Sequence, residues 1–351
     1  MRFSRFSGSK AGRRILAALF ASGIGMTALA SSDDRPYTMD FARGLGIIDF
    51  ARFVAILPVS FNLQASHTEH LTSWPGRKFR FLAYNTWGLP QPFLTHPSRF
   101  ASLAATIPHL DADVIAFGET FTSYADVLEI LDDYPYIAHG PVQDGKAAFW
   151  EIDSGLTIIS KWPILSTKTV TYSRCSGTDC WASKGALLVR IKIPEIGEVD
   201  IATTHLNAGT SAKKDSVRKS QVDELVSLLR TEIGDENLGK RPLIIGGDFN
   251  FLPDSANRAL LMMGIEGLRD TYADYVADNL DRLSSVAKNG YTYDPARNDN
   301  ASKMNSSKRI DFIFSKYPNH QRMGTLKSSI ALDYEVLGQY LSDHFGVMTD
   351  F

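Results

Sequence analysis

The sequence predicts an α/β sandwich in which mixed β-sheets are flanked by helices. From about residue 79 to the C-terminus, short apolar or β-branched runs alternate with segments whose apolar residues recur at helical spacing. Several such strands with helices between them, and without an internal repeat, are typical of this class. The chain has 351 residues, of which 44% are hydrophobic, so it can bury a large core.

Each expected element rests on its own local pattern. Helices are expected where apolar residues recur three and four apart, at 99–110, 122–131, 213–232 and 255–263. The segment 294–308 is polar and rich in Asn and Ser, which predicts an exposed loop. Strands are expected, in chain order, at 79–85, 113–118, 156–160, 168–172, 186–193, 199–205, 243–248, 310–315 and 345–351.

Residues 1–30 are typical of a signal peptide. A basic start is followed by a mostly apolar stretch, whose end, Ala28-Leu29-Ala30, fits the small-residue rule for cleavage. The alternative is a single membrane anchor, although the apolar run is short for a span and contains Gly23 and Gly25. Without this segment 32 basic and 39 acidic residues remain, so the net charge falls from −2 to −7. We therefore expect a secreted or periplasmic protein whose acidity disfavours non-specific binding to nucleic acid.

Residues 31–78 form an N-terminal extension of uncertain structure. Its apolar stretch, Ala42 to Leu63, has two interpretations. It could be a helix packed on the domain, or an interfacial segment that touches lipid. The strand and helix patterns place one domain in residues 79–351.

The two cysteines, Cys175 and Cys180, lie in the short segment Cys175-Ser-Gly-Thr-Asp-Cys180. In an exported protein, a disulfide that closes such a small loop is favoured over two free thiols. Zinc is a poor alternative, because the sequence offers no nearby histidine to complete a set of four ligands.

Six polar clusters stand at the ends of apolar strands, where a strand presents its last residue at the edge of its sheet. Singly, each has an ordinary explanation: Asn85 as a turn residue, Glu119 as a helix cap, His205 as a surface side chain. Together they are chemically complementary. The clusters are 84–90 with Asn85, 113–119 with Glu119, 203–207 with His205, 243–250 with Asp248 and Asn250, 308–312 with Asp311, and 341–345 with Asp343 and His344.

These side chains suit the hydrolysis of a phosphodiester. That reaction needs a cation to neutralise the phosphate, an activated water and a proton for the leaving oxygen. Two histidines titrate near neutrality, and a carboxylate such as Asp311 can hold an imidazole in one tautomer. No Ser or Cys belongs to the set, so no covalent enzyme intermediate is expected. Oxygen ligands, which Mg²⁺ prefers, are supplied by Glu119, Asp248, Asp343, Asn85 and Asn250.

The same residues resemble the signature of the endonuclease/exonuclease/phosphatase superfamily, to which DNase I belongs. The resemblance covers roughly residues 79–351, which it implies are a catalytic domain. It implies a DNase I-like four-layer α/β-sandwich: two packed mixed β-sheets flanked by helices, with the site at one edge. The matches, in order, are Asn85, Glu119, His205, Gly-Asp248-Phe-Asn250, Arg-Ile-Asp311 and Ser-Asp343-His344.

Further stretches resemble the neutral sphingomyelinases within that superfamily. The resemblance implies a secreted, Mg²⁺-dependent phosphodiesterase that hydrolyses sphingomyelin, or a related phospholipid, to ceramide and phosphocholine. Its partner would be the phospholipid membrane surface; no protein partner is implied, and we expect a monomer. Mn²⁺ or Co²⁺ would be able to substitute for Mg²⁺. The stretches are Asn85-Thr-Trp87-Gly88-Leu-Pro90, Glu119-Thr-Phe, Gly155-Leu-Thr-Ile-Ile-Ser-Lys161-Trp162-Pro163, Cys180-Trp-Ala-Ser183-Lys184-Gly185, His205-Leu-Asn207-Ala and Tyr291-Thr-Tyr293-Asp294-Pro295.

The resemblance assigns a role to each residue on the metal side. It implies that Glu119 binds the Mg²⁺ directly, with Asn85 beside it, and that Asp343 supports this side of the site. Lys184 has two interpretations: it neutralises phosphate charge, or it is a surface lysine at the start of a strand.

On the side of the attacking water, the resemblance makes His344 the general base, oriented by Asp311. Asp248 and Asn250 would position the water and the phosphate. His205 would contact the phosphate or assist the leaving oxygen.

Three rivals share the motifs or the fold. The first is a secreted DNase I-like endonuclease, which uses the same six clusters and whose partner would be nucleic acid. Abasic-site nucleases, however, usually follow the metal-binding Glu with a Lys, where this chain has Thr120. An inositol-polyphosphate phosphatase would carry a Cys-Asp-Arg run, which this sequence lacks. A non-catalytic binding module would usually have lost a cluster, and all six are present.

Haemolytic sphingomyelinases carry a hairpin tipped with exposed aromatic residues that enters membranes. The comparable region here, 315–331, offers only Tyr317, so strong haemolysis is not expected.

Overall fold

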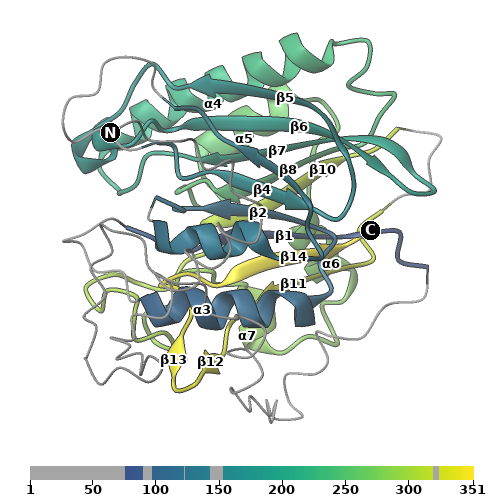
Figure 1. Cartoon of the computed structure of the whole chain (residues 1–351). Helices are drawn as coiled ribbons and strands as arrows, with labels where there is room; N and C mark the ends of the chain where they lie inside the picture. The colour runs from purple at the N-terminus through teal and green to yellow at the C-terminus, as the bar shows by residue number, and fades with distance from the viewer. Residues whose placement is uncertain (1–75, 90–96, 122, 143–152, 319–323) are drawn as a thin grey trace, which may run out of the picture.

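The computed structural model describes residues 76–89, 97–121, 123–142, 153–318 and 324–351 (Figure 1). The expected signal peptide and the apolar stretch 42–63 lie outside these residues. Within the described part of the chain, no helix is both long enough and apolar enough to span a bilayer.

Two six-stranded sheets form the body of the molecule. In order across the first sheet, the strands are β11 (Lys327–Ala331), β14 (Gly346–Asp350), β1 (Arg80–Asn85), β2 (Val114–Gly118), β4 (Thr157–Ser160) and β3 (Tyr136–His139). Across the second they are β5 (Ile164–Thr171), β6 (Gly185–Ile193), β7 (Gly197–His205), β8 (Leu243–Asp248), β10 (Asp311–Lys316) and β9 (Arg269–Asp270). A small hairpin, β12 (Glu335–Val336) and β13 (Gln339–Tyr340), leads into the last strand.

Each sheet contains one parallel pair. β1 and β2 are joined through α3 (Pro97–Thr106) and the 3₁₀ turn η3 (Ile107–Leu110), while β7 and β8 are joined through α4 (Ala212–Ile233). β10 and β14 run antiparallel to β8 and β1, so they begin where those strands end. Four strand ends and two strand beginnings therefore meet at one edge of the sandwich.

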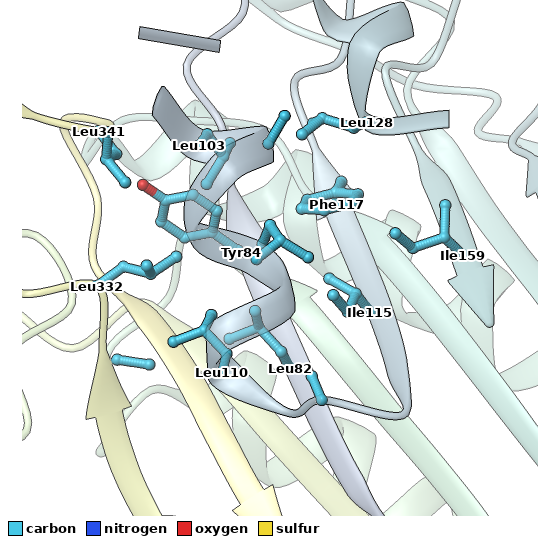
Figure 2. Packing of buried hydrophobic residues seen from close by; sticks show 14 of the residues in the cluster. Leu82, Tyr84, Leu103, Leu110, Ile115, Phe117, Leu128, Ile159, Leu332 and Leu341 are labelled. Carbon is cyan, nitrogen blue, oxygen red and sulfur yellow. The ribbon is translucent and has the colours of Figure 1, made fainter. Parts of the chain in front are cut away.

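Alternation along the strands builds three apolar cores. In β1, Phe81 and Ala83 face the other sheet, whereas Leu82 and Tyr84 face α3. Figure 2 shows Tyr84 surrounded by apolar side chains of the core between the first sheet and α3. In β8, Ile244 faces the first sheet, and its neighbours face α4 and α5 (Ala256–Gly264). The layers are therefore helix, sheet, sheet, helix, which confirms the predicted four-layer α/β-sandwich.

The helix ends follow local sequence signals. α4 begins after Ser211, whose hydroxyl accepts a hydrogen bond from the amide of Lys214, and ends at Gly234 with φ of 84°. Between the sheets, α6 (Thr271–Asp278) contacts β10 and β11. The remaining short helices are η4 (Ser123–Ile130), η5 (Gly177–Trp181) and α7 (Ser285–Asn289).

Each predicted strand and helix is present, but several elements were not predicted: β3, η5, β9, β11, the β12–β13 hairpin, α6 and α7. The segment predicted as a helix at 122–131 is a 3₁₀ helix from Ser123. The prediction of an exposed loop at 294–308 is wrong for its first half. Asn298 is fully buried there, and its side-chain amide, which donates to the carbonyl of Ser342 at 2.9 Å, is thereby satisfied. Only residues 302–306 are exposed as a run.

Candidate active site

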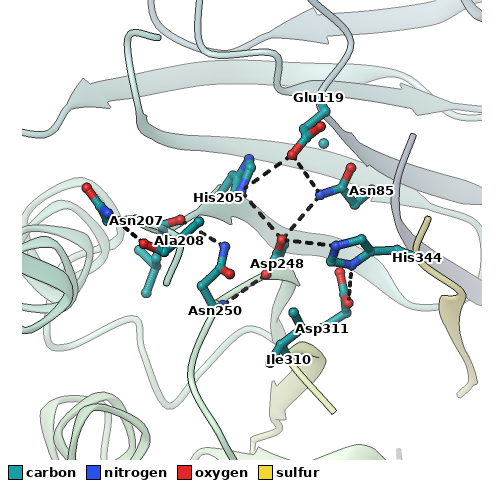
Figure 3. Close-up of polar contacts among 12 residues, drawn as sticks. Asn85, Glu119, His205, Asn207, Ala208, Asp248, Asn250, Ile310, Asp311 and His344 are labelled. Carbon is teal, nitrogen blue, oxygen red and sulfur yellow. Dashed lines mark hydrogen bonds and ion pairs between the residues drawn. The ribbon is translucent and has the colours of Figure 1, made fainter. Parts of the chain in front are cut away.

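The polar clusters converge where the parallel strands end (Figure 3). Asn85 is the last residue of β1, and Glu119 directly follows β2. His205 and Asp248 end β7 and β8 and lie opposite each other in the ladder. Asp311, which begins β10, lies opposite Asp248 on the other side. The fold thus places side chains far apart in sequence within contact distance.

Backbone strain marks three positions of the site. Glu119, Asn250 and Trp87 have φ values of 57°, 51° and 52°. In this left-handed region the backbone of a residue other than glycine is strained by about 1–3 kcal/mol. Such conformations persist where the surrounding structure holds them, and they gather at functional sites.

An asparagine amide links the two halves of the sandwich. The Nδ2 of Asn85 donates to Glu119 Oε1 and to Asp248 Oδ2, each at 3.2 Å. Its Oδ1 accepts from the backbone amide of Trp87 at 3.0 Å, and its carbonyl accepts from the Ser342 hydroxyl at 2.7 Å. Asn85 is therefore fixed on both sides.

His344 and Asp311 form a buried pair. The His344 Nδ1 lies 2.8 Å from Asp311 Oδ2, and the two residues are only 6% and 1% exposed. Burial alone would lower the pKa of His344, but the carboxylates of Asp311, Asp343 and Asp248 outweigh it and raise that pKa well above its ordinary value. With Nδ1 occupied by Asp311, the other ring nitrogen faces Asp248 at 3.9 Å.

Two residues of a neighbouring loop hold this pair in place. The hydroxyl of Thr292 accepts hydrogen bonds from the amides of Ile310 and Asp311, both at 3.1 Å. The ring of Tyr293 packs edge-on against His344, with the centroids 5.2 Å apart.

His205 is the second imidazole, and it is held neutral. Burial, followed by the positive charges of Lys184 and His344, lowers its pKa well below the ordinary value. Its Nε2 lies 3.4 Å from Asp248 Oδ2 and 3.9 Å from Glu119 Oε1.

The buried carboxylates crowd one another. Burial raises the pKa of Asp248 to about 7, and the charge of Asp311 adds to this shift. Burial also raises the pKa of Asp343 to about 7, with a further contribution from Glu119, whose own pKa burial raises as well. A divalent cation bound at this group of acids would favour their ionised forms at neutral pH.

The donor set fits a divalent cation. Oε2 of Glu119 is buried and has no hydrogen-bond partner among the described residues. The ligand atoms of Asp248, Asp311 and His344 all lie within 4.8 Å of one another. Carboxylate oxygens at this density are the ligands that Mg²⁺ prefers. Asp343 belongs to this environment through its charge, since the carboxylate of Glu119 contributes to the raised pKa of Asp343.

Asn250 closes the cluster on the side of the second sheet. Its backbone amide donates to Asp248 Oδ1 at 2.9 Å, and its Nδ2 donates to the carbonyl of Leu206 at 3.1 Å. The side-chain oxygen is then free of these bonds and available to a ligand.

Lys184 is not a surface lysine. It is 4% exposed, its Nζ pairs with Asp179 Oδ1 at 2.8 Å, and it also donates to the carbonyl of Leu206 at 3.3 Å. Its partner Asp179 lies in the turn that a disulfide closes between Cys175 and Cys180. Its positive charge acts on Glu119, Asp248 and His205.

Asp179 was not predicted from the sequence. Its Oδ2 accepts from Asn207 Nδ2 and from the amide of Ala208, each at 3.0 Å, next to the end of β7. Its place between the two cysteines, five residues before Lys184, was the available signal.

Arg99 was also missed as a site residue. It is buried on α3, and its guanidinium donates to the carbonyls of Thr86 at 2.6 Å, Trp87 at 2.7 Å and Leu341 at 2.5 Å. Arg99 therefore joins the loop after Asn85 to the loop before Asp343. An arginine within a helical pattern gives no such signal.

Sequence comparisons match the part of the chain that carries these residues. A model of the Endonuclease/Exonuclease/phosphatase family matches residues 82–344. A sphingomyelinase from Dictyostelium discoideum is 28% identical over 116 residues, which cover 29% of this chain and 25% of that protein. The chain thus matches about a quarter of the length of this curated relative.

Solved structures share the fold. Sphingomyelinase C from Streptomyces griseocarneus superposes with a TM-score of 0.58 at 20% identity, covering 78% of this chain and 98% of that one. A beta toxin variant from Staphylococcus aureus with bound magnesium ions gives 0.60 at 17% identity, with 78% and 99% covered. TDP2 from D. rerio, in complex with a single-strand DNA product, gives 0.59 at 18% identity, with 78% and 98% covered. The fold is therefore DNase I-like, and the relatives include sphingomyelinases, as the motifs indicated.

Proposed function

Because the chain belongs to the endonuclease/exonuclease/phosphatase family, we propose that it is a secreted, Mg²⁺-dependent phosphodiesterase that hydrolyses sphingomyelin, or a related phospholipid, to ceramide and phosphocholine. The observation that carries the proposal is the buried His344–Asp311 pair, which opens onto the carboxylate cluster of Glu119 and Asp248.

His344 is suited to act as the general base. Asp311 accepts the Nδ1 proton, so Nε2 is the nitrogen that faces the cluster. Without a cation, the carboxylates raise the pKa of His344 and favour the protonated ring. A divalent cation held beside Asp248 and Asp343 would offset part of that negative charge and favour the neutral ring, whose Nε2 can take a proton from water. The negative charge of Asp311 stabilises the imidazolium formed by that transfer. The Thr292 and Tyr293 contacts keep the ring in this orientation.

The metal side is formed by Glu119, with Asn85 beside it and Asp343 supporting it. A Mg²⁺ ion bound there would supply positive charge to the phosphate and to the leaving oxygen. The unpartnered Oε2 of Glu119 supports this assignment. Mn²⁺ and Co²⁺ are expected to substitute.

The remaining residues are assigned to the phosphate. Asp248 and Asn250 position the water and the phosphate, and neutral His205 contacts the phosphate or assists the leaving oxygen. Lys184, which already lowers the negative potential of the cluster, would contribute its charge to the bound phosphate.

The choice of lipid substrate rests on the second set of motifs and on the D. discoideum relative. Export is supported by the Cys175–Cys180 disulfide, a bond that persists in oxidising compartments. The second candidate function is a secreted endonuclease, which the likeness to DNA-bound TDP2 favours.

Parallel hydrolysis assays distinguish these functions. Purified protein is incubated with vesicles of sphingomyelin, phosphatidylcholine or phosphatidylethanolamine, and with plasmid DNA, in Mg²⁺ or in EDTA. Mg²⁺-dependent release of phosphocholine from sphingomyelin, with intact plasmid, is expected. Nicked plasmid with intact lipid would move the protein to the nuclease function. Release from phosphatidylcholine alone would make it a phospholipase C for glycerolipids with the same head group, and release from phosphatidylethanolamine alone would change the head group as well.

A further inference from the structure

A cavity of about 570 Å³ lies apart from the catalytic cluster. It is lined by residues of α6, α7, the segment 291–297 and β11, is partly open to solvent, and contains no residue of the six catalytic clusters. Its volume is within the range of roughly 300–1,000 Å³ found for pockets that bind small molecules. The residues that define the cavity by their chemistry are Tyr272, Tyr275, Tyr291, Ser329, Arg297 and Asp333.

Aromatic rings form much of the wall. Tyr272 is fixed, because its hydroxyl donates to the carbonyl of Ala287 and the guanidinium of Arg309 lies 5.5 Å from its ring centroid. Tyr275 and Tyr291 are only partly buried, so ring surface and hydroxyls remain accessible to a ligand. Serines of β11, and Ser284 at the N-cap of α7, add further hydroxyl groups.

The charges of the wall are balanced. The wall carries two cations, Arg297 and Lys327, and two carboxylates, and Arg297 Nη2 bonds Asp333 Oδ2 at 2.6 Å. The other carboxylate, Asp294, accepts from the hydroxyl of Ser307 at 2.5 Å. A wall with two opposite pairs of charges does not select a simple anion or cation, and its many hydroxyls disfavour a wholly apolar ligand.

We propose that this cavity binds a neutral carbohydrate of one or two rings. A sugar ring offers a C–H face that packs on a tyrosine ring, and a rim of hydroxyls that both donate and accept hydrogen bonds. The cavity offers both the tyrosine rings and the hydrogen-bonding groups that a sugar needs, because hydroxyl, carboxylate and guanidinium groups line it together with Tyr275 and Tyr291.

The position of the cavity connects it to the catalytic pair. Tyr291 and Asp294 line the cavity, and the two residues between them contact the site. Thr292 binds the amide of Asp311 and, through its carbonyl, the amide of Phe345 at 2.6 Å. Tyr293 packs against His344. A sugar held against Tyr291 therefore restrains the segment that orients the base.

The test is a titration of the full-length protein with free sugars, without lipid and without Mg²⁺, followed by saturation-transfer NMR and calorimetry. The panel contains methyl glycosides of glucose, galactose, mannose and N-acetylglucosamine, together with maltose and lactose. At least one sugar is expected to bind with Kd on the order of 1 mM. Vesicles carrying a glycolipid with the same sugar show whether the source is a free glycan or a lipid head group.

Two variants test whether the sugar binds in the cavity. Tyr275→Ala removes a ring and Ser329→Trp fills the cavity, and each is expected to weaken binding at least about tenfold. Tyr136→Ala, which removes an exposed tyrosine of β3 outside the cavity, is expected to leave binding unchanged. The proposal is overturned if no sugar of the panel binds, or if Tyr275→Ala and Ser329→Trp bind as the unmodified protein does.

Discussion

Replacing Asp311 by Asn tests the proposed base most sharply. The substitution preserves the volume of the side chain but removes the charge that faces His344 across 2.8 Å. Both residues are buried, so water does not screen the interaction. A hydrogen bond to a charged group contributes about 1.5–3 kcal/mol, which corresponds to a fall in kcat of roughly 10- to 150-fold.

The assay is the initial rate of phosphodiester hydrolysis at saturating Mg²⁺, with kcat and KM determined separately. The loss is expected in kcat, because Asp311 stabilises the imidazolium that forms during the reaction. Asp200→Asn is the matched control. Asp200 is an equally buried carboxylate, paired with Arg190 at 2.8 Å and Arg241 at 3.0 Å, at the other end of β7. A folded Asp311→Asn protein with kcat within about threefold of the unmodified value would refute the assignment, since threefold is under 1 kcal/mol.

Three further predictions concern stability. Gly247→Ala should lower the free energy of unfolding by about 3 kcal/mol and abolish activity, because φ is +146° and the new Cβ would lie 2.2 Å from the carbonyl oxygen of Thr204. Arg99→Met should lower it by at least about 3 kcal/mol, because three buried carbonyls lose their donor. For Asp248 and Asp343, pKa values raised from 3.8 to about 7 mean that the folded protein binds more protons than the unfolded chain between these pH values. The metal-free protein should therefore lose stability as pH rises from 3.8 to about 7, and Mg²⁺ should restore it.

Each of these predictions has a control measured by chemical or thermal unfolding. Gly239→Ala should change stability by less than about 1 kcal/mol, because no atom lies within 4 Å of the added Cβ. Arg230→Met removes a half-exposed arginine and should cost far less than Arg99→Met. Asp343→Asn in EDTA should show a smaller loss of stability with pH. An unchanged loss would contradict the assigned pKa shift.

The position of the site was predictable because the sequence marks where strands end. Apolar runs that stop at Asn85, Asp248 and His205 mark the ends of strands, and parallel neighbours bring those ends to one edge. By contrast β11, with the sequence KSSIA, has too few apolar residues to show an alternating pattern. It forms because β14 beside it offers a complete hydrogen-bonding edge.

The contacts around the site were less predictable, because they join segments far apart in sequence. Arg99 bonds Leu341, 242 positions away, and nothing in the helix pattern of its own segment marks that partner. Lys184 was open to a surface interpretation for the same reason. Its burial depends on Asp179 in the disulfide-closed turn and on the carbonyl of Leu206.

The central claim is that His344, with divalent metal, hydrolyses a phosphocholine ester. The most direct measurement is phosphocholine release from sphingomyelin vesicles by the unmodified protein and by His344→Ala, each in Mg²⁺ and in EDTA, with folding verified by circular dichroism. The account predicts release only by the unmodified protein in Mg²⁺. Release that persists in His344→Ala, or in EDTA, would contradict it.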